Sequence, residues 1–112
     1  MEKNVIENKE KESKIIILEM EEFFHELRLQ VIKTVTEKYK GKLPSFEYGE
    51  YLVKNPNKIP ERLKDGDWYF LLGSPLISYI RWDGKEFILH PVRLIQADEE
   101  WNVADHLILL EK

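Results

Sequence analysis

The stretch from Lys14 to Lys40 constrains the fold more than any other part of this chain, because its apolar residues recur at steps of three and four. This spacing is typical of an amphipathic helix that buries one face. At 1.5 Å per residue, such a helix would be roughly 40 Å long. The pattern predicts one long N-terminal helix over residues 14–42. The main apolar line consists of Ile16, Met20, Phe23, Leu27, Val31, Val35 and Tyr39.

Signals for the end of this helix follow directly. Gly41 can adopt the left-handed conformation that closes a helix, and Pro44 prevents its continuation. Residues 1–13 are almost entirely polar and are expected to form a frayed tail with weak helical character. Within this tail, Asn4 and Glu7 have the spacing of a capping box, which would start the helix earlier.

Residues 43–112 carry mainly strand patterns. The five apolar residues from Trp68 to Leu72 predict a strand that is covered on both faces. Residues 106–110 favour a final strand, with a short helix capped at Asp98 as the alternative. Residues 45–54 fit either a strand or a short helix capped by Ser45, and the sequence leaves this choice open.

The clearest hairpin signal is Asp83-Gly84, the preferred pair for a two-residue type I′ turn. It would connect strands over residues 77–82 and 85–89 and place Arg81 opposite Glu86. Pro91 indicates an edge strand or a break in the strand. The same register places four large side chains on one face, which we expect to join the core: Ile80, Trp82, Phe87 and Leu89.

These elements predict an α+β fold in which the long helix is followed by a curled antiparallel meander of about four or five strands. A small barrel or half-barrel would bury the strands that are apolar on both sides. An open sheet, covered by the helix on one face and by a partner on the other, is the alternative. With 112 residues, the chain fits one domain with a single modest core.

Composition limits the classes of function. The chain has no cysteine, which excludes disulfides, thiolate chemistry and cysteine zinc sites. It has no apolar run of about 20 residues, the length that spans a bilayer, and its charged start is unlike a signal peptide, so we expect a cytoplasmic protein. The net charge of −4 gives no overall electropositive surface for nucleic acid. Many Lys and Glu residues with only two Gln fit a heat-adapted protein.

The sequence has no catalytic, cofactor or metal signature. His25-Glu26 lacks the second histidine of the metalloprotease helix motif, since Leu29 stands in its place. Asp105 and His106 are neighbours in a predicted strand, so they would point to opposite faces and form no catalytic pair. We therefore expect no catalytic residues, no metal and no cofactor. An enzyme with an unrecognised carboxylate site ranks third among the hypotheses.

The length of the predicted helix has a consequence for function. A sheet would extend roughly 20 Å along its strands and would leave part of the helix uncovered. A second expected contact is the aromatic sheet surface around Trp68, Tyr79 and Trp82. The leading hypothesis is a small non-enzymatic interaction module, such as an adaptor, accessory subunit or inhibitor. We expect it to form a homodimer or bind a heterologous protein through helix positions with heptad spacing: Ile17, Met20, Phe24, Leu27 and Val31.

The second hypothesis is nucleic-acid binding by the loop over residues 54–64. This loop carries four basic side chains against the single carboxylate of Glu61, a net charge of 4 − 1 = +3. Lysines at the helix end would extend the surface, and nearby tyrosines could stack on bases. A solvated loop is the commoner explanation in a lysine-rich protein. The predicted contacts are Lys54, Lys58, Arg62 and Lys64.

Overall fold

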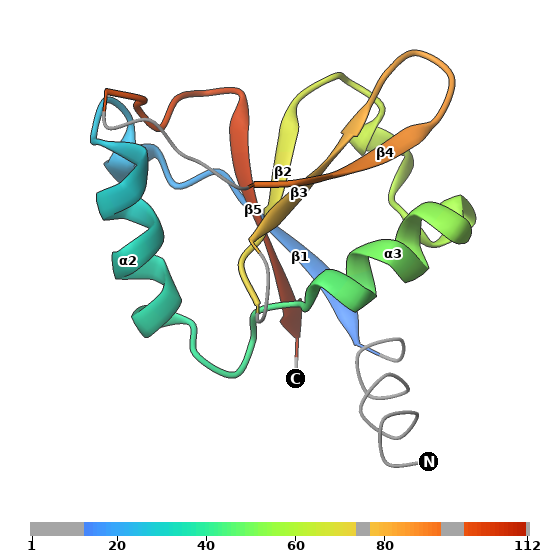
Figure 1. The fold of residues 1–112 in the computed structure, drawn as a ribbon, viewed down its shortest axis with the longest axis horizontal. Coiled ribbons are helices and arrows are strands. Elements are labelled where there is room, and N and C mark those ends of the chain that lie inside the picture. Colours follow the sequence, from blue (N-terminus) through green and yellow to red (C-terminus); the bar gives the residue numbers. More distant parts are fainter. Residues whose placement is uncertain (1–12, 74–76, 93–97, 112) are drawn as a thin grey trace.

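The computed structural model describes residues 13–73, 77–92 and 98–111 and shows an open mixed sheet with a helix packed on each face (Figure 1). The strand order is β1-β5-β2-β3-β4. The strands are β1 (Lys14–Leu18), β2 (Trp68–Leu71), β3 (Ser78–Trp82), β4 (Phe87–Pro91) and β5 (Asp105–Glu111). The helices are α2 (Arg28–Lys38) and α3 (Phe46–Lys54), with single 3₁₀ turns η1 (Glu21–Phe23), η2 (Pro56–Lys58) and η3 (Glu61–Leu63).

The prediction of one long helix over residues 14–42 is wrong, because its first part is strand β1 and only α2 is an α-helix. Three consecutive isoleucines in β1 favour a strand, and β1 pairs antiparallel with β5, for example at Ile16 and Leu109. Between β1 and α2, Met20 and His25 have positive φ angles of 60° and 74°, which no helix can contain. The apolar spacing was therefore shared by a strand, a turn and a shorter helix.

The helix also ends earlier than predicted, because α2 ends at Lys38 and its C-cap is Tyr39. Gly41 has a φ of +89°, in the left-handed region, three residues after the last helical residue, Lys38. The chain then crosses the end of the sheet, where Lys42 C=O accepts from Leu110 N–H and Pro44 C=O accepts from Gly73 N–H, both at 2.9 Å. This crossing places the next helix on the opposite face.

The predicted antiparallel meander and barrel are also wrong. Strand β5 pairs in parallel with β2, and β1 and β4 are the two edges of an open sheet. The individual strands were found more successfully, since residues 68–71 and 105–111 are both strands as expected. The order of strands depends on β1 and β5 coming together from distant parts of the chain, for which there is no local signal.

The hairpin at residues 83–86 is present, but its loop has four residues instead of two. Asp83 explains the longer loop, since its carboxylate accepts from the N–H groups of Lys85 and Glu86 at 2.8 and 2.9 Å. Arg81 therefore pairs with Ile88, and Trp82 with Phe87. A shift of two residues keeps every side chain on its face. The four predicted core side chains accordingly all contribute to one cluster.

Residues 46–54 form α3, so the helical alternative for this segment is correct. Ser45 caps the helix by accepting from Tyr48 N–H at 3.1 Å. Gly49 faces β4 so closely that a Cβ atom there would lie 2.9 Å from a methyl carbon of Leu89. The absence of a side chain at Gly49 therefore allows α3 to lie close to the edge strand.

Two hydrophobic clusters occupy the two faces of the sheet, so α3 covers the face for which a partner was proposed. One cluster lies between the sheet and α3 and includes Leu52, Ile80 and Ile108, all fully buried. The other lies between the sheet and α2 and includes Val31 and Trp101. The predicted tail up to residue 12 and its capping box at Asn4 and Glu7 lie outside the described residues.

Candidate functional site

The outer edge of β4 presents backbone groups that pair with none of the described strands. The register of β4 with β3 fixes which of its backbone groups face β3. Two hydrogen bonds set this alternation, one from Val92 N–H to Ile77 C=O and one from Asp83 N–H to Glu86 C=O. Ile88 and His90 bond towards β3, and the N–H and C=O groups of Phe87 and Leu89 point away from it. Among the described residues, no strand pairs with this edge. Such an edge can pair with another extended chain.

A groove of about 480 Å³ runs between this edge strand and α3. On the α3 side, Phe46 and Val53 are seven residues apart and share one face of the helix. On the β4 side, alternate residues point towards the groove. The apolar lining also includes Phe87, Ile88, Leu89 and Pro91, while the exposed charged side chains of the lining are Glu50, Lys54 and Glu86. The groove therefore combines an apolar floor with a mixed charged border.

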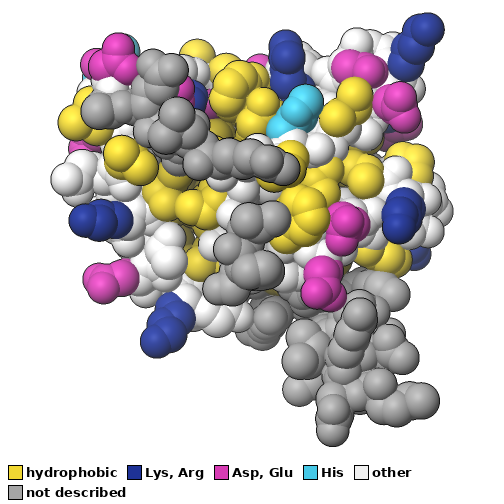
Figure 2. All heavy atoms as spheres, viewed as in Figure 1, with side chains coloured by type: hydrophobic (Ala, Val, Ile, Leu, Met, Phe, Trp, Pro, Cys, Tyr) yellow, Lys and Arg dark blue, Asp and Glu magenta, His cyan; other side chains and the backbone are white. Residues whose placement is uncertain are grey.

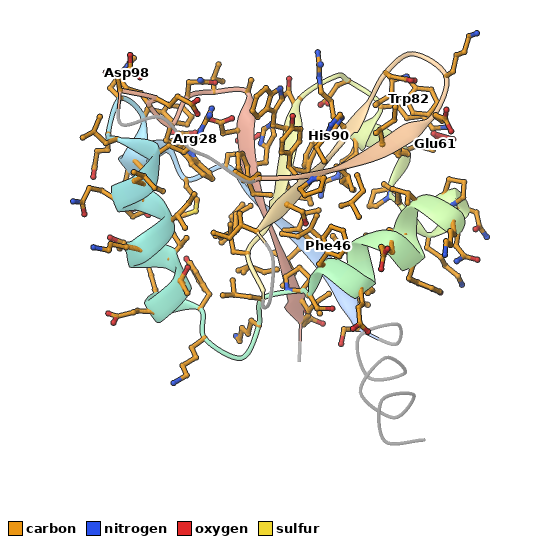
Figure 3. All side chains as sticks on the ribbon, in the orientation of Figure 1. Arg28, Phe46, Glu61, Trp82, His90 and Asp98 are labelled. Carbon is orange, nitrogen blue, oxygen red and sulfur yellow. The ribbon has the colours of Figure 1, made fainter. Side chains whose placement is uncertain are left out.

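On the α2 side of the sheet, rings from three strands stack in a row that runs across the strands. Tyr79 of β3 stacks on Trp68 of β2, with centroids 4.5 Å apart and planes inclined by 5°. Its other neighbour is His90 of β4, at 4.8 Å and 20°. The guanidinium of Arg28 lies 5.1 Å from the Trp68 ring centroid. The row thus ends in a histidine on the edge strand, labelled in Figure 3.

Arg28 anchors the first turn of α2 to the sheet. Its guanidinium donates to both carboxylate oxygens of Asp105, at 2.9 and 3.1 Å, and to Glu99. Arg28 is 7% exposed and Asp105 is 1% exposed, so this ion pair is buried. Asp105 also accepts from Asn102 N–H at 3.0 Å. These contacts use every carboxylate oxygen of Asp105, which indicates a structural role.

A second polar cluster lies on the opposite face, at the same end of the sheet. His106 Nε2 lies 2.7 Å from an Asp67 carboxylate oxygen, and its ring stacks on Tyr69. Tyr69 donates its hydroxyl proton to Asp65 at 2.7 Å. As expected, Asp105 and His106 point to opposite faces and do not form a pair. The described residues contain no group of three side chains suited to hold a metal ion, and this cluster fastens the 64–67 turn to β2 and β5.

The Tyr69 hydroxyl gives a testable pH dependence. Burial, followed by the bond to Asp65, raises the pKa of Tyr69 well above its ordinary value near 10. The unfolded chain therefore loses this proton first, and the stabilisation that is complete below pH 10 decreases as the pH rises above it. Urea unfolding at pH 8 to 11 should show a steeper loss of stability in the wild type than in Tyr69→Phe. Parallel losses in the two proteins would contradict this assignment.

The predicted helix interface is divided among different environments. Ile17 belongs to β1 and is half-buried, and Met20 and Val31 are buried in the core beneath α2. Phe24 is half-buried, while Leu27 is 46% exposed just before α2. These residues form no continuous face of a helix. Of the predicted aromatic contact, Trp68 and Tyr79 lie together, and Trp82 packs against Phe87 on the opposite face.

The predicted basic loop is also dispersed. Lys54 lines the β4–α3 groove, and Lys58 lines a second groove of about 270 Å³ beside β1. Arg62 is exposed in η3. The ammonium of Lys64 bonds to Glu61 at 2.8 Å and lies 4.9 Å from the Trp82 ring centroid. Because α2 and α3 lie on opposite faces (Figure 1), the lysines that end α2 are not brought to this loop, and nucleic-acid binding stays a prediction.

The groove residues Phe46 and Val53 were not predicted as a site. Pro91 and the hairpin signal did indicate an edge strand, which was the available clue. Comparison with protein families, curated proteins and solved structures finds no match for this chain. None of the helices in the described part of the chain is long and apolar enough to cross a membrane.

Proposed function

We propose that this protein is a small non-enzymatic interaction module that binds an extended segment of a partner protein beside β4. The observation that carries the proposal is that the β4 edge, which pairs with no other strand in the described part of the chain, lies next to an apolar groove. Strand addition at a sheet edge gives affinity through backbone hydrogen bonds and specificity through pockets for alternate side chains. Outward-facing backbone groups and an apolar groove for side chains both lie along β4, a strand of five residues.

The backbone of β4 defines how the segment would bind. Phe87 and Leu89 each offer one N–H and one C=O group, and Pro91 offers only its C=O group. Side chains of the bound strand that fall opposite Leu89 would enter the groove between β4 and α3, whose lining favours aliphatic groups. Ordering a flexible segment has an entropic cost, so we expect micromolar rather than nanomolar affinity.

This proposal replaces the predicted helix interface with a sheet edge and keeps the class of function. An adaptor, an accessory subunit and an inhibitor could each use such an edge. The cytoplasmic location expected from the sequence stays a prediction. A second copy of the chain is the competing occupant, and the experiment below distinguishes it.

The test is a selection from a displayed library of random 12-residue peptides against the purified protein. We expect enriched sequences with apolar residues at alternate positions, because only every second side chain can enter the groove. Val53→Glu, which places a carboxylate in the groove lining, should weaken binding of an enriched peptide at least tenfold. The matched control is Val103→Glu, since Val103 is 73% exposed and does not line this groove.

Light scattering during size-exclusion chromatography should show a monomer of 13.4 kDa for the wild type and both variants. Circular dichroism verifies that Val53→Glu is folded. A wild-type dimer that Val53→Glu dissociates would show that a second copy occupies the edge and would overturn the proposal. Enriched peptides that bind Val53→Glu as well as the wild type would also overturn it.

A further inference from the structure

We infer that the segment bound beside β4 carries an aromatic residue opposite His90, flanked by two aliphatic residues. This inference rests on the proposed function, because it specifies the ligand of the same edge. It follows from the row of stacked rings that ends at His90 and from the alternation of side chains along β4.

The His90 ring has one face on which no ring of the described residues stacks. Its other face stacks on Tyr79, which lies directly opposite it on β3. Among the described residues, no second ring stacks on His90, and its side chain is only half-buried. In Figure 2 a histidine is visible at the surface among hydrophobic side chains, at the place labelled His90 in Figure 3. Because the ring stacks on Tyr79 of β3, its opposite face is directed away from β3.

The spacing of strands matches the spacing of the stack. Adjacent strands lie about 4.8 Å apart, and Tyr79 and His90 stack across one such interval at 4.8 Å. A residue directly opposite His90 on an added strand would therefore place its ring at stacking distance. Such a ring would continue the existing row of Trp68, Tyr79 and His90 by one member.

The flanking positions of the segment have a different environment. They lie opposite Leu89 and Pro91, whose side chains line the groove on the other face of the sheet. The apolar lining from Phe46 and Val53 favours aliphatic side chains there. The recognised pattern is therefore aliphatic–aromatic–aliphatic in an extended conformation.

A second copy of β4 does not supply this ring. Antiparallel pairing centred on Leu89 would place Ile88 of the second copy opposite His90, and pairing centred on Ile88 would place Glu86 there. Pairing centred on His90 would stack two imidazoles but would set Pro91, which has no N–H, opposite Leu89. An unrelated segment with an aromatic residue can make the backbone hydrogen bonds to β4 and also stack a ring on His90.

The test compares two parallel selections from the same displayed library, one against the wild type and one against His90→Ala. We expect both to yield apolar residues at alternate positions, and only the wild type to enrich Phe, Tyr or Trp between two of them. Replacing that aromatic residue with alanine in a fluorescein-labelled enriched peptide should lower its affinity for the wild type about threefold to tenfold. The same replacement should change affinity for His90→Ala less than twofold.

The outcomes separate the two proposals. Alternating apolar peptides without an aromatic preference, or with the same preference for His90→Ala, would overturn this inference and leave the proposed function standing. Selections without an alternating pattern would overturn both. The alanine replacement in the peptide is measured on the wild-type protein, so the result does not depend on whether His90→Ala folds.

Discussion

Replacing Arg28 with methionine is expected to lower the free energy of unfolding by about 3–5 kcal/mol. The change leaves the Asp105 carboxylate, which is 1% exposed, without its cation in the interior. It also removes the guanidinium from the Trp68 ring. Since domains of this size are stable by about 5–15 kcal/mol, the variant should be close to the limit of folding. Urea denaturation followed by circular dichroism measures the loss.

Two further variants identify the cause of this effect. Lys33→Met changes an exposed cation on the same helix and should alter stability by less than about 0.5 kcal/mol. Combining Arg28→Met with Asp105→Asn removes the unpaired charge and keeps an acceptor for Asn102 N–H, so it should recover part of the stability. Equal losses in the single and double variants would show that the buried charge is not responsible.

Trp101→Ala is expected to have an effect of similar size, about 3–5 kcal/mol, because it opens a cavity at a fully buried side chain. The Trp101 ring packs 5.4 Å from the Phe70 ring, between centroids. Its backbone bonds to the segment between β1 and α2, accepting from His25 N–H and donating to Glu26 C=O, both at 2.8 Å. Loss of the ring should therefore loosen this segment as well as the core.

Urea denaturation measures the global loss, and hydrogen exchange at the His25 amide measures the local one. Val103→Ala, two residues away and 73% exposed, is the matched control and should change stability by less than about 0.5 kcal/mol. A global loss below about 1 kcal/mol for Trp101→Ala would contradict the assignment of this side chain to the well-packed core.

Sequence patterns were sufficient where the signal is local. The continuous apolar run from Trp68 and the left-handed Gly41 act within a few residues of their position, whereas the Ser45 cap offered a helix only as one of two alternatives. The hairpin was predicted for the same reason, and its loop length was missed because the Asp83 carboxylate captures two backbone N–H groups. Local sequence signals therefore predicted individual strands and turns better than they predicted loop lengths and strand order.

The segment from Lys14 shows why the remainder could not be predicted. Short apolar runs fit a helix or a strand equally well, and β1 is decided by pairing with β5 at the other end of the chain. The candidate site could not be predicted for the same reason. The groove exists because α3 packs beside β4 at the Gly49–Leu89 contact, and neither segment carries a local signal for the other.

The parallel pairing of β5 with β2 has a consequence for synthesis of the chain on the ribosome. Strand β5 lies between β1 and β2, so residues 14–18 have no sheet to join until residues 105–111 have left the exit tunnel. The segment from β1 through β5 must therefore be translated before β1 is paired. Both hydrophobic clusters include residues of β5, so neither cluster can be completed before residues 105–111 have left the tunnel.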